Sequence, residues 1–283
     1  MFRRERSGTF AATAAIGASA VVVAATGIAV VLLGASRSHA KAAAVVAVPA
    51  APAVTTPRPI GYAHQASTRH ARAAYATLRL QQLLARLGYL PVSWRSGAFT
   101  WHSGYPGTLG GFWHPGRPNL ITTGAIMAFE SQHGMRPRGT ASPAVWKVLL
   151  RAAGQRQMNT AGYTYAIASQ MTPETLTIWH NGREVFRSYA NTGIPVAPTA
   201  NGTFPVYLRY YFQVMRGTNP DGSRYADPVY YISYFHAGEA VHYFFRSGYG
   251  WPQSLGCVEL PWSSAAKAWP YLTYGSLVTV KPA

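Results

Sequence analysis

Residues 175–186, with the sequence TLTIWHNGREVF, decide the fold class of the C-terminal part of the chain. Apolar and polar side chains alternate along 175–179, which is the period of a β-strand with one buried face. Asn181 and Gly182 follow, and this pair favours a two-residue hairpin turn. The chain then returns through Glu184–Phe186, so the stretch predicts a β-hairpin.

The strand character continues from this hairpin to the end of the chain. Four further segments are rich in aromatic and β-branched residues, which favour strands: 206–212, 229–235, 240–244 and 276–280. One helix is predicted over 263–269. We therefore predict a mostly β domain over residues 159–283, built as a sandwich or a partly open barrel.

Residues 71–158 show helical spacing instead. A first helix is predicted up to Gly88, and a second over 122–133. A third is predicted after Ser142, an N-cap residue that proline follows at the first helical position. A loop rich in Gly, Trp and Pro occupies 91–120. This region is predicted to form a small helical bundle.

The N-terminal residues predict a membrane segment followed by a linker. Residues 7–36 carry no charge, follow basic residues and are long enough to cross a bilayer as a helix. We expect an uncleaved anchor over 1–36, whereas Ser38–Ala40 has the form of a signal-peptide cleavage site. Residues 37–70 are rich in Ala and Pro, which predicts a linker. With either interpretation the rest of the chain is expected outside the cytoplasm, anchored or secreted.

The composition excludes several kinds of function. The chain has 283 residues, with 25 Lys and Arg against 8 Asp and Glu, and a formal net charge of +17. So few carboxylates leave little room for a calcium site, a carboxylate-bridged metal site or a paired-carboxylate glycosidase. The single cysteine excludes an intramolecular disulfide and a multi-cysteine zinc site. We therefore expect neither a metal nor a cofactor.

Positive charge is concentrated in residues 60–158, which hold eleven basic residues and one acid. Such a region attracts polyanions. For a protein outside the cytoplasm, we expect anionic envelope polymers rather than nucleic acid as partners. A solvated basic surface without a specific partner is the other interpretation.

The candidate nucleophile is Cys257, within the sequence PQSLGCVELP at 252–261. The reactive form of cysteine is the thiolate, which needs a nearby base or cation to form at neutral pH. Gly256 lets the backbone bend closely, and Ser254 can hold the turn through its side chain. We expect the N–H groups of Gly256 and Cys257 to stabilise a developing oxyanion. The other interpretation is a buried, inert cysteine that only fills space.

The candidate base is His242. It lies on a predicted strand, and the Gly- and Pro-containing loop over 246–253 can bring it back to Cys257. The same region contains His180 and His236, each beside a predicted turn. These two are interpreted as surface or core histidines, and His242 is preferred because its strand leads directly into the cysteine loop.

Three stretches within 163–280 resemble the L,D-transpeptidase catalytic domain. The matching residues are His242 followed by SLGCVEL at 254–260, then NTG at 191–193 with PTANGTF at 198–204, and YGSLVTV at 274–280. The first is similar to the active-site signature of the family, the second to its substrate-side stretch and the third to its final strand.

The resemblance implies acyl transfer through a thioester. Cys257 would attack a peptidoglycan stem-peptide carbonyl and release the terminal D-amino acid. His242 would take the thiol proton and later serve the amine of a second stem, which forms a cross-link. The resemblance also implies a lowered pKa for Cys257 and reaction with carbapenem-type β-lactams. An L,D-carboxypeptidase, in which water resolves the thioester, and a non-catalytic wall-binding or scaffolding protein are the other interpretations.

Two positions differ from the family pattern. Leu255 stands where the family often has His, so the base chemistry is assigned to His242 alone. Glu259 stands where Arg or Asn is common, and it is interpreted either as a group that holds a substrate amine or as a solvated loop acid. On the loop before the motif, Tyr249 and Trp251 are candidates for lining the substrate cleft.

Residues 71–158 resemble the peptidoglycan-binding domain that is often attached to cell-wall enzymes. The matching stretches are LQQLLARLGY at 80–89, TGAIMAFE at 123–130 and the segment 133–149. Arg136–Arg138 replace an Asp-Gly turn of that family, and the loop over 91–120 is longer than expected. The resemblance implies binding to the cell wall, and a packing or spacer domain is the other interpretation.

Overall fold

The computed structural model describes the backbone of residues 60–283 and the side chains of residues 68–283. The expected membrane segment over 1–36 lies outside these residues, as does most of the expected linker over 37–70. The last part of that linker is helical, because helix α1 begins at Ile60. Among the helices that the structure describes, none combines the length and the apolar character needed to cross a membrane.

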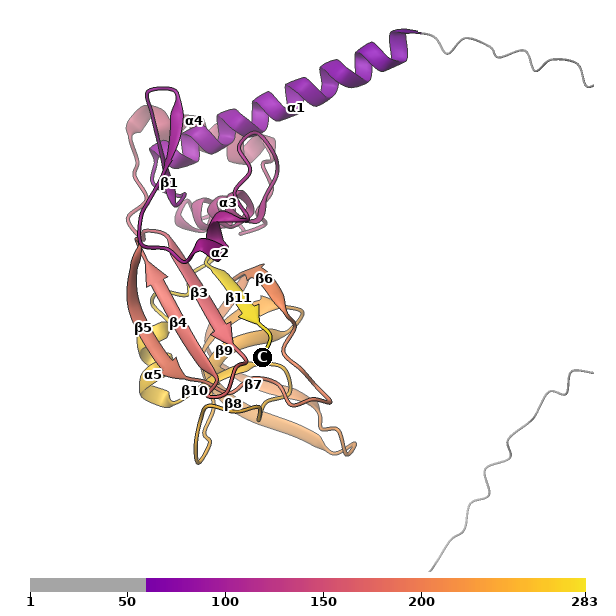
Figure 1. Cartoon of the computed structure of the whole chain (residues 1–283), viewed down its shortest axis with the longest axis vertical. Coiled ribbons are helices and arrows are strands. Elements are labelled where there is room, and N and C mark those ends of the chain that lie inside the picture. The colour runs from indigo at the N-terminus through magenta and orange to yellow at the C-terminus, as the bar shows by residue number, and fades with distance from the viewer. Residues whose placement is uncertain (1–59) are drawn as a thin grey trace, which may run out of the picture. The chain divides into compact units, whose positions relative to one another are not determined.

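The C-terminal region folds into two β-sheets with helix α5 beside them (Figure 1). The first sheet has the order β5-β4-β3-β11-β6 and the second has the order β10-β9-β8-β7. The strands of the first sheet are β3 Thr164–Ser169, β4 Thr175–His180, β5 Arg183–Tyr189, β6 Gly202–Pro205 and β11 Leu277–Lys281. Those of the second are β7 Leu208–Thr218, β8 Arg224–His236, β9 Glu239–Tyr243 and β10 Val258–Leu260. The prediction of a mostly β domain is confirmed, and α5 (Trp262–Ala268) is the predicted helix.

The core between the two sheets fixes which side chains face the functional site. Val258 and Leu260 of β10 are buried in this core together with Val241 of β9. Because side chains alternate across a strand, residues between them face the opposite side. Strands β9 and β10 pair in parallel with Glu259 opposite His242. The packing of the core thus places these two side chains next to each other on the outer face.

The strand predicted over 206–212 is divided between the two sheets. The Val206 N–H donates to the carbonyl of Ser276, next to the first sheet, over 2.9 Å. The Tyr207 N–H donates to the carbonyl of Tyr234, in the second sheet, also over 2.9 Å. The chain therefore crosses between the sheets at this peptide, and no glycine or proline within 206–212 marks the crossing.

The three helices predicted in the preceding region are present, and the loop between the first two has structure of its own. The helices are α1 Ile60–Arg86, α3 Leu120–Gln132 and α4 Pro143–Gln155. The loop contains strands β1 Val92–Arg95 and β2 Ala98–Trp101 and the short helix α2 Gly107–Gly110. Ser142 caps α4 as predicted, but α3 starts earlier than predicted because its cap is Asn119, which accepts from the Thr122 N–H.

The helical region packs directly onto the β domain. Leu84 and Phe129 from the helices share one buried cluster with Tyr165 and Leu277 from the first sheet. Gly124 of α3 lies so close to the chain before β11 that a Cβ there would clash with the carbonyl of Gly275. This shared core joins the two predicted domains through packed side chains and not only through the connecting chain.

Candidate active site

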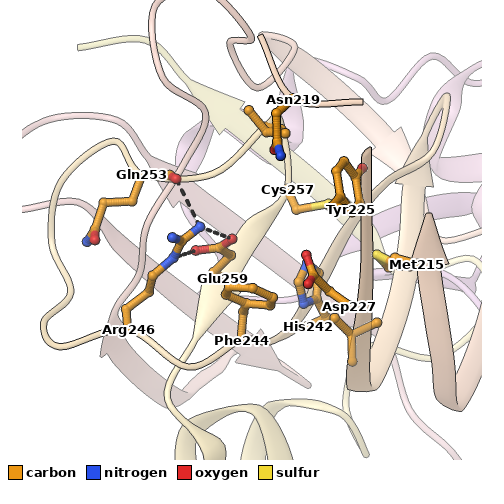
Figure 2. A pocket seen from close by; sticks show the side chains of 12 residues that line it. Met215, Asn219, Tyr225, Asp227, His242, Phe244, Arg246, Gln253, Cys257 and Glu259 are labelled. Atoms are coloured by element: carbon orange, nitrogen blue, oxygen red, sulfur yellow. Dashed lines mark hydrogen bonds and ion pairs between the residues drawn. The ribbon is translucent and has the colours of Figure 1, made fainter. Parts of the chain in front are cut away.

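One pocket of about 240 Å³ lies on the outer face of the second sheet (Figure 2). Its walls come from β7, β8, β9 and β10 and from the loop that joins β9 to β10. The lining residues are Met215, Asn219, Tyr225, Asp227, Val229, His242, Phe244, Arg246, Gln253, Leu255, Cys257 and Glu259. The predicted nucleophile and the predicted base thus border the same space.

The turn before Cys257 is built by a serine and a glycine. The buried Ser254 donates its hydroxyl to the Cys257 carbonyl over 2.6 Å and accepts the Gly256 N–H over 3.1 Å. Gly256 has a φ of +111°, a conformation that only glycine adopts without strain. The predicted oxyanion role of the Gly256 N–H is not available here, because Ser254 occupies that donor. The Cys257 N–H has no acceptor among the described residues and is the donor left for an oxyanion.

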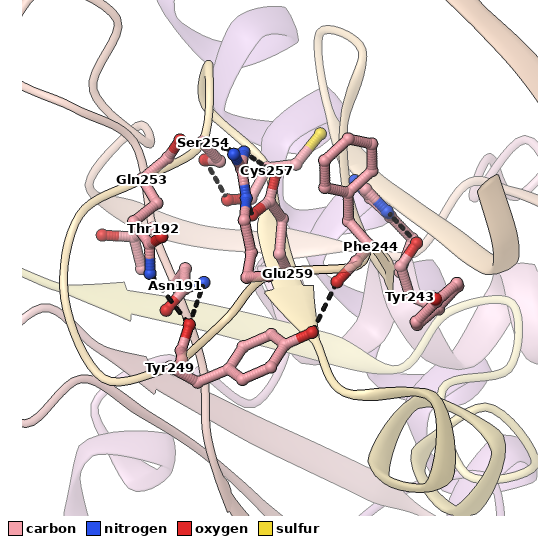
Figure 3. Close-up of polar contacts among 12 residues, drawn as sticks. Asn191, Thr192, Tyr243, Phe244, Tyr249, Gln253, Ser254, Cys257 and Glu259 are labelled. Atoms are coloured by element: carbon pink, nitrogen blue, oxygen red, sulfur yellow. Dashed lines mark hydrogen bonds and ion pairs between the residues drawn. The ribbon is translucent and has the colours of Figure 1, made fainter. Parts of the chain in front are cut away.

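The stretch at 191–193 supports the cysteine loop from behind (Figure 3). The carbonyl of Thr192 accepts the N–H groups of Gln253 and Ser254, each over 2.9 Å. Asn191 and Glu259 exchange two backbone hydrogen bonds of 3.0 and 2.9 Å. None of 191–193 lines the pocket. The structure therefore gives this stretch, similar to the substrate-side part of the family, a role in fixing the loop that carries Cys257.

The buried Glu174 fixes the position of Thr192 within this stretch. Glu174 accepts the Thr192 N–H over 2.6 Å and the Thr192 hydroxyl over 2.7 Å. Burial raises the pKa of Glu174, and these two hydrogen bonds oppose that shift. Gly193 lets the backbone approach Ala197 closely, because a Cβ at this position would clash with the Ala197 carbonyl.

The thiol of Cys257 is held in its protonated form. Burial of the sulfur raises the pKa of Cys257 to about 12, and the nearby acids Glu259 and Glu239 add to the shift. A hydrogen bond from the Ala240 backbone lowers this pKa in part. The expected lowering of the thiol pKa is therefore wrong for this structure. Among the described residues, this backbone hydrogen bond is the one interaction that favours the thiolate.

His242 is prepared to accept a proton. Burial lowers the pKa of His242 below its usual range, so the ring is neutral at neutral pH. Its Nδ1–H donates to the carbonyl of Tyr243 over 2.8 Å, which leaves Nε2 with the free lone pair. No hydrogen bond joins the ring to Cys257 in the structure, although both line the pocket. Such bonds are often long before substrate binds.

The raised thiol pKa predicts slow reaction with a simple alkylating agent. At pH 7 we expect iodoacetamide to modify Cys257 at least about 100-fold more slowly than free cysteine, because little thiolate is present. The rate should rise roughly tenfold per pH unit between pH 7 and 10. Mass spectrometry of the intact chain measures it, and the urea-unfolded chain is the control. A fast rate that levels off below pH 8 would contradict the raised pKa.

Glu259 is neither a solvated loop acid nor a free amine-binding group. Both of its oxygens are held by the guanidinium of Arg246, over 2.8 Å from Nε and 2.9 Å from Nη2. Arg246 also donates to the carbonyl of Gln253 over 3.0 Å and lies over the ring of Phe244, 4.7 Å from its centre. This two-pronged pair is the polar floor of the pocket (Figure 2).

The two predicted cleft aromatics lie outside the pocket. Tyr249 donates its hydroxyl to the carbonyl of Phe244 over 2.6 Å and so closes its own loop. Trp251 is half exposed and packs over Gly248. In the structure these two aromatic side chains therefore shape their own loop and do not line the pocket. Leu255 does line it.

The remaining histidines are engaged elsewhere. His180 bonds through Nδ1 to the Thr164 hydroxyl over 3.0 Å, and His236 lies 3.5 Å from a Glu239 oxygen. Neither lines the pocket, whereas His242 does. Within the described residues, no group of three or more His, Cys, Asp or Glu is placed to hold a metal ion.

Several pocket residues belong to no recognisable sequence motif. Asp227 and Tyr225 come from β8, Met215 comes from β7, and Arg246 follows β9. Their nearness to Cys257 depends on how β7 and β8 pair and on the path of the cysteine loop. The sequence feature that could have pointed to Asp227 is the scarcity of acidic residues, since it is one of only eight in the chain.

One region of the chain matches a known protein family. Residues 164–280 match the family model YkuD, the L,D-transpeptidase catalytic domain. The comparison with curated proteins gave no match. The helical region before residue 164 is not included in the matched range, so its resemblance to a peptidoglycan-binding domain stays a prediction.

Solved L,D-transpeptidases are also similar to parts of the chain. One from Mycobacterium smegmatis is 23% identical, with a TM-score of 0.39, over 42% of this chain and 58% of its own length. The catalytic domain of the E. faecium enzyme is 25% identical, with a TM-score of 0.38, over 42% of this chain and 96% of its own. One from Stackebrandtia nassauensis is 21% identical, with a TM-score of 0.34, over 62% of this chain and 86% of its own. The match thus spans little more than half of the M. smegmatis protein, and the family assignment rests on the model match alone.

Proposed function

We propose that the chain transfers acyl groups between peptidoglycan stem peptides through a thioester on Cys257, since residues 164–280 match the family model of the L,D-transpeptidase catalytic domain. The observation that carries this proposal is the shared pocket of the Cys257 thiol and the His242 imidazole. Since the Tyr243 carbonyl occupies Nδ1 of that ring, the basic Nε2 is the nitrogen left for proton transfer.

The first half-reaction forms the acyl-enzyme. The sulfur of Cys257 attacks the carbonyl carbon of a stem peptide while its proton moves to Nε2 of His242. The thiol starts protonated because its pKa is raised to about 12, so attack and proton transfer occur together. The N–H of Cys257 stabilises the oxyanion. The imidazolium then gives its proton to the departing amine of the terminal D-amino acid, and the C–N bond breaks.

The second half-reaction consumes the thioester. An amine of a second stem attacks the carbonyl carbon and loses a proton to His242, the C–S bond breaks, and His242 passes that proton to the sulfur. One amide bond replaces another, so no ATP is required outside the cell. The same site would act as a carboxypeptidase if water took the place of the amine, and the outcome depends on acceptor binding and water exclusion.

The remaining parts of the chain support a role at the cell wall. The uncharged N-terminal segment would anchor the protein in the membrane, or direct its secretion if cleaved, with the catalytic domain outside the cytoplasm. The excess of basic residues over 60–158 would favour contact with anionic envelope polymers. The helical region would then hold the pocket near its substrate.

The test is the fate of muropeptides incubated with the protein. We expect loss of the terminal D-amino acid, cross-linked dimers and an adduct on the intact chain with a carbapenem. Cys257→Ser should abolish all three, because the thioester cannot form. Trimmed stems without dimers would establish a carboxypeptidase instead. No adduct and no change in the stems would leave a non-catalytic wall-binding protein.

A further inference from the structure

Asp227 differs from the other acids in the described part of the chain in having no hydrogen-bond or ion-pair partner. Seven of the eight carboxylates have described side chains, and six of these accept a hydrogen bond or form an ion pair. The six are Glu130, Glu174, Glu184, Asp221, Glu239 and Glu259. Asp227 has neither interaction among the described residues. A carboxylate without a partner in a chain with 25 basic residues requires an explanation.

The position of Asp227 points to the reaction site. It lies on β8, opposite Met215 of β7, and its half-buried side chain lines the pocket with Cys257 and His242. The close-up shows its carboxylate beside the imidazole (Figure 2). Its charge acts on the His242 ring, where it favours the protonated form.

The charges of the pocket favour a cation. The lining residues include one guanidinium, that of Arg246, and two carboxylates, those of Glu259 and Asp227. Arg246 and Glu259 neutralise each other through their two hydrogen bonds. Asp227 therefore gives the pocket a net negative charge, although the chain as a whole carries a formal charge of +17. A positively charged group is the ligand that this local field attracts.

We propose that Asp227 binds the ammonium group of the acceptor strand and so directs the thioester toward an amine instead of water. The inference rests on the proposed transpeptidase function. A side-chain amine has an ordinary pKa of about 10.4 and arrives protonated at neutral pH. A charge-assisted hydrogen bond to a carboxylate fixes it where the acyl group waits.

The transfer step uses the three protons of the bound ammonium in turn. The bound ammonium releases one proton to solvent and becomes the free amine. Its nitrogen forms a bond to the thioester carbonyl carbon, and the C–S bond breaks. A second proton of the amine passes through Nε2 of His242 to the departing sulfur, which restores the thiol. The amide keeps the third proton.

The experiment compares Asp227→Asn with the unaltered chain using three nucleophiles. The donor is a stem peptide that ends in a D-amino acid and has its side-chain amine acetylated. The acceptors are the same peptide with a free amine and no terminal D-residue, the uncharged nucleophile hydroxylamine, and water. Mass spectrometry measures D-amino acid release and each product. Glu184→Gln is the matched control, because it removes one carboxylate charge outside the pocket.

We expect Asp227→Asn to lower the rate of transfer to the ammonium peptide at least about tenfold. This is the effect expected from the loss of one hydrogen bond between charged groups. Release of the D-amino acid and transfer to hydroxylamine should fall by less than about threefold. Glu184→Gln should change none of these rates.

Two results would overturn the inference while leaving thioester chemistry intact. One is an equal loss with the ammonium peptide and with hydroxylamine, which would mean that Asp227 acts through His242 or through the fold. The other is an unaltered chain that releases the D-amino acid but transfers to no amine. A chain that neither releases the D-amino acid nor carries a thioester would instead refute the proposed function itself.

Discussion

His242→Gln is expected to lower the rate of acyl-enzyme formation by about 10² to 10⁴-fold. The thiol of Cys257 starts protonated, since burial raises its pKa to about 12. Attack then requires a base that takes the proton as the S–C bond forms, and His242 is the one neutral imidazole in the pocket of the described structure. Glutamine is similar in size and still offers an N–H to the Tyr243 carbonyl, so the fold should persist. Rates of carbapenem adduct formation, followed by intact mass, provide the measurement.

The shape of the pH profile separates this role from a structural one. Because the pKa of His242 is lowered, the base stays neutral below its ordinary value of about 6.5, and acylation should decline only at more acidic pH. The acid limb should vanish in His242→Gln. His180→Gln removes a histidine outside the pocket and should leave both rate and profile unchanged. Unaltered acylation in His242→Gln would exclude this residue as the base.

Local sequence patterns predicted those parts of the fold in which neighbours along the chain decide the structure. The hairpin at 175–186 forms because Asn181 and Gly182 adopt the positive φ angles, 49° and 78°, that its turn requires. The helix after Ser142 forms as its cap predicts. Strand β3 was not predicted because its sequence, TYAIAS, shows no regular alternation of apolar and polar residues.

Burial of β3 limits what its sequence pattern can reveal. β3 lies between β4 and β11, and Tyr165, Ala166 and Ala168 are all completely buried. A strand covered on both faces loses the alternation that identifies a strand with one wet face. The crossing between Val206 and Tyr207 was not predicted either, because the β-prone run over 206–212 continues across it while the two N–H groups donate to residues of different sheets or beside them.

For the site, the sequence pointed to two residues that the structure places in one pocket, but not to their surroundings. Cys257 and His242 stand out because the chain has one thiol and few imidazoles in this region. Arg246, Asp227 and the state of the thiol depend on tertiary packing. Glu259 shows the difference most clearly: its sequence position suggests a ligand for substrate, and only the structure reveals that a residue thirteen positions earlier already occupies both oxygens.

Arg246→Ala is expected to destabilise the folded chain by about 3 kcal/mol, the low end of the range for breaking a buried ion pair. The cost arises from Glu259, whose side chain is only 6% exposed and would keep its charge without a partner. The low end applies because the Arg246 side chain is 28% exposed, so water can enter. The midpoint of urea unfolding provides the measurement.

The chain contains a matched control and a rescue for this prediction. Arg187 and Glu184 form the same two-pronged pair over 2.9 Å, but with side chains 58% and 41% exposed, so Arg187→Ala should cost less than about 1 kcal/mol. Adding Glu259→Gln to Arg246→Ala should recover part of the lost stability, because the uncompensated charge is removed. If Arg246→Ala cost no more than Arg187→Ala, burial of Glu259 would not be the cause. If the double variant were as unstable as the single one, the loss would lie in the contacts of the guanidinium with Phe244 and Gln253, and the pair would shape the pocket floor chiefly through packing.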